Sequence, residues 1–191
     1  TEQLERMLQD PDSARSWFRQ LGLQDLERAH KNLVGIRQSG MVPELLSHIC
    51  GQLESILPRM SDPDRVLNNL DRFIAATRNA LSLGALMERD EEALPTLLQI
   101  FSASQYFADL LIQDPEGFDL LRLTEGQPIA REVLIEDICK EALATQDLPT
   151  IMQAIRRYKQ REMLRIAYGD VIRGQPVATV TSGVPDWLYP R

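Results

Sequence analysis

The chain has 191 residues, 43% of them hydrophobic and 26% charged, as is usual for a globular protein that buries a core. Its formal net charge of −7 argues against general binding to nucleic acid. No apolar stretch is long enough to cross a bilayer, and the sequence opens without a recognisable signal peptide. We therefore expect a cytoplasmic protein that does not contact membranes.

Cysteine and histidine are too scarce and too scattered to suggest a metal centre. Cys50 and Cys139 have no metal-ligand spacing, and His30 and His48 have no ligating neighbours. We expect both cysteines to be small buried residues of a reduced protein, and we expect no metal site.

Apolar residues recur at helical spacing along nearly the whole chain, whereas strand patterns are almost absent. The sequence therefore predicts an all-α fold, a bundle of eight or nine helices. The expected helices cover roughly residues 2–9, 11–21, 23–38, 43–57, 63–88, 94–113, 115–123, 128–145 and 149–173.

Two kinds of helix start alternate along the chain. In the first, a capping aspartate precedes a proline at the first helical position, and in the second an apolar residue precedes the proline. The first kind occurs at Asp10-Pro11, Asp62-Pro63 and Asp114-Pro115, and the second at Val42-Pro43, Leu94-Pro95 and Leu148-Pro149. Their spacing of 52 to 54 residues fits a helical-pair repeat, but such starts are also common in unrelated helices.

Two further segments bear on the domain organisation. The segment from Pro95 is apolar around most of its circumference, which predicts a helix at the buried centre of the bundle. Beyond residue 176 the sequence is rich in turn residues. We therefore expect one helical domain over residues 1–176 and an extended C-terminal tail over residues 177–191.

The segment 151–172 is the most distinctive of the chain, because it combines an apolar helical stripe with many cations. Two interpretations remain open: a solvated basic face, which is the usual role of such runs, or a surface for an anion or an acidic partner. Over residues 154–173 the cations are Arg156, Arg157, Lys159, Arg161, Arg165 and Arg173, and the anions are Glu162 and Asp170.

Glu162 lies inside the apolar stripe of this helix, four residues after Tyr158 and four before Ile166. A buried carboxylate needs a partner, because burial without one is costly. We expect that partner to be Arg165 on the next turn or an arginine from another helix, unless Glu162 reaches the solvent at the edge of the stripe.

No catalytic motif is recognisable. The sequence has no P-loop, no glycine-rich dinucleotide fingerprint and no nucleophile elbow. Metal-dependent phosphoryl transfer needs carboxylates that hold Mg²⁺ against phosphates, and no strand that would carry them is predicted. The residue chemistry thus predicts a helical domain and identifies no catalytic residue.

Three segments together resemble the N-terminal helical region of the glutamine synthetase adenylyltransferase family, whose members are also called adenylyl-removing enzymes. Residues 62–73 read DPDRVLNNLDRF, residues 94–121 read LPTLLQIFSASQYFADLLIQDPEGFDLL, and residues 154–170 read AIRRYKQREMLRIAYGD. The resemblance lies in their order and spacing and extends over about residues 62–181.

The resemblance implies a large bifunctional cytoplasmic enzyme. One nucleotidyltransferase domain of that enzyme transfers AMP from ATP to a tyrosine of glutamine synthetase, and a related domain removes it by phosphorolysis. It further implies Mg²⁺ as a cofactor, and the PII signal protein and glutamine as regulators.

The chain departs from the family pattern in one respect that matters for function. The Gly-Lys-Leu-Gly-Gly and Ser-Asp-x-Asp motifs that carry the family's metal-binding carboxylates do not occur in it. No catalytic residue is therefore carried over, and we expect a non-catalytic helical part that braces an adjoining nucleotidyltransferase domain. Arg156, Arg157, Arg161 and Arg165 are the candidate contacts.

Two alternatives stay open at this point. The chain could be a stand-alone helical interaction module without an enzymatic parent. The basic helix could also bind nucleic acid, in which case the affinity would fall steeply with salt.

Overall fold

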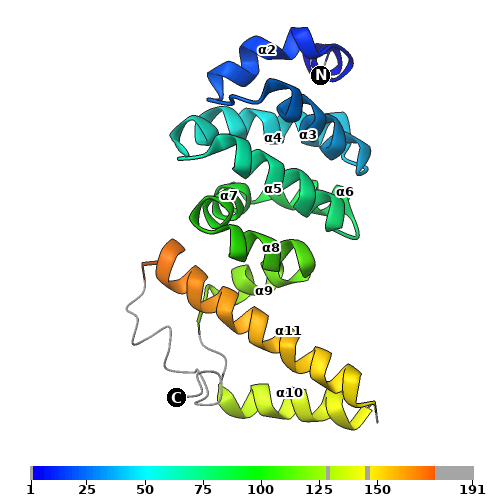
Figure 1. Ribbon diagram of the computed structural model, residues 1–191, viewed down its shortest axis with the longest axis vertical. Coiled ribbons are helices and arrows are strands. Elements are labelled where there is room, and N and C mark those ends of the chain that lie inside the picture. Colours follow the sequence, from blue (N-terminus) through cyan, green and yellow to red (C-terminus); the bar gives the residue numbers. More distant parts are fainter. Residues whose placement is uncertain (1, 128–129, 145–146, 175–191) are drawn as a thin grey trace. The chain divides into compact units, whose positions relative to one another are not determined.

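The computed structural model describes residues 2–127, 130–144 and 147–174 (Figure 1). Within these ranges the only regular secondary structure is helical: eleven α-helices, one 3₁₀ turn and one π-helical turn. The all-α prediction is confirmed. The chain divides into two compact units, Thr1–Pro115 and Glu116–Arg191. The predicted domain boundary at residue 176 and the tail that follows it lie outside the described residues and stay predictions.

The first unit is a stack of short helices in which each packs on its neighbours along the chain. In Figure 1 the layers run from α1 and α2 through α3 and α4 to α5 and α6, and then to α7 and α8. The helices are α1 Glu2–Gln9, α2 Pro11–Gln20, α3 Leu26–Gln38, α4 Pro43–Ile56 with a 3₁₀ turn Leu57–Arg59, α5 Pro63–Ala76, α6 Ala80–Arg89, α7 Ala93–Ala103 and α8 Gln105–Gln113.

Two of the three predicted Asp-Pro helix starts are present in the structure. The side chain of Asp10 accepts a hydrogen bond from the Asp12 backbone N–H (3.1 Å), and that of Asp62 accepts one from the Arg65 N–H (3.0 Å). Both side chains satisfy backbone donors that the first helical turn leaves without an internal partner. At the third place Asp114 instead ends α8, and the next helix begins one residue after the proline.

The structure has more helices than predicted because two long predicted helices are each broken in the middle. Thr77 leaves the helical conformation at ψ 136°, and the Asn79 side chain then caps α6 by accepting from the Ser82 N–H (3.0 Å). Ser104 adopts an extended conformation between α7 and α8. Short polar side chains favour such helix ends over helix interiors, but the apolar spacing continues past both breaks and conceals them.

Helix α7 is buried around most of its circumference in the first unit, as its apolar sequence predicted, although it lies in the last layer of the stack and not at its centre. Leu94, Leu97, Leu98 and Phe101 are all fully buried. The ring of Phe101 meets that of Phe73 from α5 edge to face, with 5.8 Å between centroids. This geometry places the positive edge of one ring on the negative face of the other.

A polar cluster joins α5 to α8 inside the same unit. Asn69, which is fully buried, exchanges two amide hydrogen bonds with Gln105 (3.0 and 3.2 Å). Arg72 donates to both Asn69 (3.1 Å) and Asp109 (2.8 Å). Because the polar groups of Asn69 would be costly to bury unpaired, this cluster fixes how α8 lies on α5.

The expectation for the cysteines was right for one and wrong for the other. Cys50 is buried in α4, and burial, with a smaller effect of Glu54, raises the pKa of its thiol to about 12. Cys139 is exposed. It lies on a helix whose main neighbour is a single other helix, and most of the side chains that the structure describes on that helix are exposed.

No helix in the described part of the chain is long and apolar enough to cross a membrane. Among the same residues, no group of three or more histidine, cysteine or acidic side chains is arranged to hold a metal ion.

Candidate functional site

The second unit holds the most distinctive segment of the sequence. Its helices are α9 Glu116–Thr124, α10 Arg131–Ala144 and α11 Leu148–Ala167, and α11 continues into a π-helical turn Tyr168–Ile172. Helix α11 begins at Leu148, with Pro149 in its first turn and with Asp147 accepting from the Thr150 N–H (3.2 Å).

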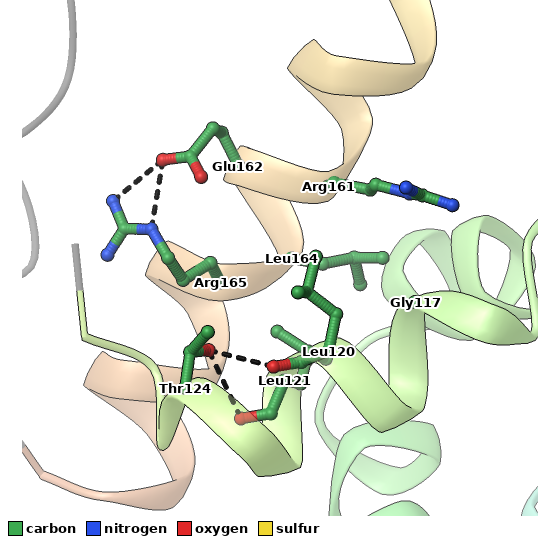
Figure 2. A pocket seen from close by; sticks show the side chains of 8 residues that line it. All are labelled: Gly117, Leu120, Leu121, Thr124, Arg161, Glu162, Leu164 and Arg165. Atoms are coloured by element: carbon green, nitrogen blue, oxygen red, sulfur yellow. Dashed lines mark hydrogen bonds and ion pairs between the residues drawn. The ribbon is translucent and has the colours of Figure 1, made fainter. Parts of the chain in front are cut away.

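Glu162 and Arg165 form a buried ion pair on α11. The Arg165 Nε and one terminal nitrogen each lie 2.9 Å from the same oxygen of Glu162 (Figure 2). The Arg165 and Glu162 side chains are only 3% and 7% exposed. The structure confirms the first of the partners considered for this carboxylate, the arginine one turn further along the helix.

Arg165 also links α11 to the turn that follows α9. Its other terminal nitrogen donates to the carbonyl oxygen of Gly126 (3.1 Å). The guanidinium thereby satisfies a carboxylate and a backbone acceptor at once, as its forked donors allow. A lysine at this position would offer a single point charge and could not reproduce this arrangement.

Gly126 lies very close to the end of α11. Its φ of +75° is a left-handed conformation, and a Cβ atom there would lie 3.1 Å from the Gly169 Cα and 2.9 Å from the Tyr168 ring. Two glycines thus let two backbones approach each other. The approach occurs at the π-helical turn, where the Arg173 N–H donates to the Tyr168 carbonyl five residues earlier (3.1 Å).

A small cavity lies beside the ion pair, between α9 and α11. Its volume is about 10 Å³, room for roughly one water molecule. It therefore has no space for a nucleotide. Its lining residues, drawn in Figure 2, are Gly117, Leu120, Leu121, Thr124, Arg161, Glu162, Leu164 and Arg165.

The four candidate arginines do not converge on one surface. Arg165 is buried in the ion pair, whereas Arg156 and Arg157 are exposed. Arg161 is half-buried, and Figure 2 shows its side chain directed away from the Glu162–Arg165 pair. Being four residues apart, Arg157 and Arg161 share one side of α11, and Arg156 lies on another.

The sequence did not reveal the roles of Gly126 and Gly169. A glycine after a predicted helix indicates only that the helix ends there. Gly126 meets Arg165 across 39 residues of sequence, and nothing in the local pattern encodes a contact at that separation.

Replacing Gly126 with alanine tests the close approach. We expect the free energy of unfolding of the second unit to fall by about 2 kcal/mol or more. Alanine costs about 1–2 kcal/mol in the left-handed region, and its Cβ would also displace the backbone of Gly169. The measurement is hydrogen exchange of α9 and α11 amides.

Gly174→Ala is the matched control for that substitution. Gly174 also has a positive φ (58°), but among the residues that the structure describes, its chain neighbours aside, no atom lies within 4 Å of the position its Cβ would take. Equal losses in the two variants would show that the contact with Gly169 contributes nothing.

Comparison with known proteins finds similarity to one group of enzymes. The family model for glutamate-ammonia ligase adenylyltransferase matches residues 94–185. The bifunctional glutamine synthetase adenylyltransferase/adenylyl-removing enzyme of Pseudomonas syringae pv. tomato is 27% identical over 94% of the chain. Over most of its length the chain is similar to these adenylyltransferases.

Two further enzymes of the same name support this relationship. That of Methylococcus capsulatus is 29% identical over 74% of the chain, and that of Thioalkalivibrio sulfidiphilus is 24% identical over 89%. The chain corresponds to only part of such an enzyme, since it spans 19% of the length of the Pseudomonas syringae protein. No solved structure matches it.

Proposed function

We propose that this chain is the N-terminal helical part of an enzyme that transfers AMP from ATP to a tyrosine of glutamine synthetase and removes it again. The observation that carries the proposal is similarity over 94% of the chain to bifunctional adenylyltransferase/adenylyl-removing enzymes. In this proposal ATP and Mg²⁺ bind to an adjoining nucleotidyltransferase domain, and the helical part is itself non-catalytic. Glutamine synthetase and the PII signal protein are the proposed partners of the whole cytoplasmic enzyme.

The helical part would brace that domain through cations on α11. Of the candidate contacts Arg156, Arg157, Arg161 and Arg165, we choose Arg157 and Arg161 for the test because they share one side of the helix. Arg165 is unsuited to such a contact, because its guanidinium is buried against Glu162 and the Gly126 carbonyl.

The test uses an enzyme of the full length of its relatives that contains this chain. We expect Arg157→Ala combined with Arg161→Ala to lower AMP transfer to glutamine synthetase about tenfold or more, the effect of losing roughly 1.4 kcal/mol of positioning. Both substitutions leave the Glu162–Arg165 pair in place, and the melting temperature of the variant, measured beside its activity, separates a loss of positioning from a loss of stability. Arg19→Ala combined with Lys31→Ala, at exposed positions of the first unit, is the control.

Two results would contradict the proposal. Full activity of the Arg157/Arg161 variant would assign these arginines to solvated surface. AMP transfer by the 191-residue chain alone, with ATP, Mg²⁺ and glutamine synthetase supplied, would show that the chemistry lies within the helical part.

A further inference from the structure

The most extensive contact between helices of the first unit, that of α3 with α5, encloses a carboxylate. Asp71 on α5 is half-buried and lies against Gly35 on α3. A Cβ atom on Gly35 would lie 3.1 Å from the Asp71 Cγ and 3.2 Å from one carboxylate oxygen, and closer still to the other oxygen. The carboxylate therefore occupies the space that the missing side chain of Gly35 leaves open.

Among the described residues, Asp71 has neither a hydrogen bond nor an ion pair through its side chain. The other polar groups of this contact are satisfied. The Asp64 carboxylate accepts from two backbone N–H groups of the turn before α3 (both 3.0 Å), and Arg28 donates twice to Asn68 (3.1 and 2.9 Å). Asp64, Asn68 and Asp71 follow one side of α5 at steps of four and three residues. Asp71 is thus the member of this polar line that has no donor.

The contact of α5 with α8 shows how the corresponding carboxylate is paired elsewhere in the same unit. There Arg72 on α5 binds Asp109 on α8 at 2.8 Å. Helix α5 begins 37 residues after α3, and Arg72 follows Gly35 at the same interval. Gly35 therefore has the place on α3 that Arg72 has on α5. Asp71 lacks the cation that Asp109 has.

Neighbouring charges do not replace that cation. Lys31 lies one turn before Gly35 but is exposed, and Arg72 is bound to Asp109 and Asn69. None of the other charged or titratable residues on α3, on α5 or on the elements packed against α5 forms an ion pair with Asp71. They are Glu27, Arg28, His30 and Arg37 on α3, Asp64 and Arg65 on α5, Arg59 on the 3₁₀ turn, Glu88 and Arg89 on α6, and Tyr106 and Asp109 on α8, whereas α7 has none.

Burial without a partner changes how Asp71 titrates. It raises the pKa of the Asp71 carboxyl above its ordinary value of 3.8, because the charged form loses hydration. The folded chain then binds this proton more tightly than the unfolded chain does, so stability falls as the pH rises from 3.8 through the raised pKa. Above that range the charge on Asp71 lowers stability. Below it, the carboxyl is neutral in both states and the loss is absent.

We propose that Asp71 makes the α3–α5 contact pH-sensitive: the charged carboxylate weakens the contact at neutral pH, and a proton on that carboxylate strengthens it. The contact joins the layer of α3 and α4 to the layer of α5 and α6 (Figure 1). Protonation of this one side chain therefore strengthens the attachment of two successive layers of the stack. This property concerns the first unit alone and does not depend on AMP transfer.

Asp71→Asn tests the proposal, because it removes the charge and nearly keeps the size of the side chain. The measurement is urea unfolding of the 191-residue chain, followed by hydrogen exchange of α3 and α5 amides. At pH 7 we expect the urea midpoint to rise by about 0.3 M or more relative to the natural sequence. The gain should shrink as the pH is lowered towards 3.8. Because the two chains are compared at each pH, the titration of all other groups cancels.

Two substitutions of the same kind serve as controls. Glu91→Gln, at an exposed turn position, changes the net charge by the same amount and should leave the midpoint unchanged. Asp109→Asn removes a carboxylate that is paired with Arg72, so it should lower the midpoint at pH 7. The same chemical change should thus stabilise the α3–α5 contact and destabilise the α5–α8 contact.

Gly35→Ala tests whether the close approach is the cause. The added Cβ would occupy the position of the Asp71 carboxylate, which stands at the end of a side chain and can turn towards the solvent. In the Gly35→Ala background, Asp71→Asn should therefore give little or no gain at pH 7. The direct measurement is a carbon NMR titration of the Asp71 carboxyl. Its midpoint should lie above 3.8 in the natural chain and return towards 3.8 in Gly35→Ala.

Three outcomes would overturn the proposal. Asp71→Asn could lower the midpoint at pH 7, which would show that the charged carboxylate stabilises the contact. The gain could be equal at every pH, which would assign it to packing and not to charge. The Asp71 carboxyl could titrate at or below 3.8, which would show that burial against Gly35 does not disfavour the charged form.

Discussion

Arg165→Ala is expected to destabilise the second unit by about 3–5 kcal/mol, the usual loss when one partner of a buried ion pair is removed. The substitution leaves the Glu162 carboxylate, 7% exposed, without a cation, and leaves the Gly126 carbonyl without its donor. We expect hydrogen exchange of α11 to accelerate strongly, and the helical signal of this unit to be lost at a lower urea concentration.

Replacing both residues of the Glu162–Arg165 pair separates the effect of the buried charges on stability from the effect of side-chain packing. Glu162→Leu combined with Arg165→Met removes the buried charges together and fills similar volume, so most of the lost stability should return. The exposed pair Glu2–Arg6 is the control, because its side chains are 85% and 73% exposed and Arg6→Ala should have no measurable effect. A single Arg165→Ala substitution as harmless as Arg6→Ala would refute the structural role given to the pair.

Phe101→Ala is expected to lower the free energy of unfolding of the first unit by about 3–5 kcal/mol, because it removes a fully buried aromatic ring. The Phe101 ring is fully buried and meets Phe73 edge to face. The loss combines the hydrophobic transfer of the ring with the cavity that the surrounding helices cannot close. Urea unfolding followed by circular dichroism measures it as a lower transition midpoint with an unchanged slope.

Tyr106→Ala controls for the removal of an aromatic ring as such. Tyr106 lies at the start of α8 and is 51% exposed, so we expect a loss below about 1 kcal/mol. If Phe101→Ala and Tyr106→Ala shifted the midpoint equally, Phe101 would not be a core residue of the first unit.

Within the described residues, helix existence could be predicted from the sequence and helix ends only in part. The capping aspartates at positions 10 and 62 were identified correctly, because an N-cap is a local interaction between a side chain and the next three residues. The breaks at Thr77–Asn79 and Ser104 were missed, because the apolar period runs through them. Cys139 was misplaced because burial depends on which helices surround α10.

At the candidate site too, the sequence predicted the contact within one helix and missed the contact between distant segments. Sequence by itself determined that Glu162 lies in an apolar stripe, that it requires a partner, and that Arg165 is in reach, because helix periodicity fixes which residues are neighbours one turn apart. Only the tertiary structure decided that Arg165 is enclosed rather than presented on the surface, and that it binds Gly126, 39 residues earlier in the chain. Contacts between distant segments depend on how whole helices pack, and packing is a property of complementary surfaces that no local spacing records.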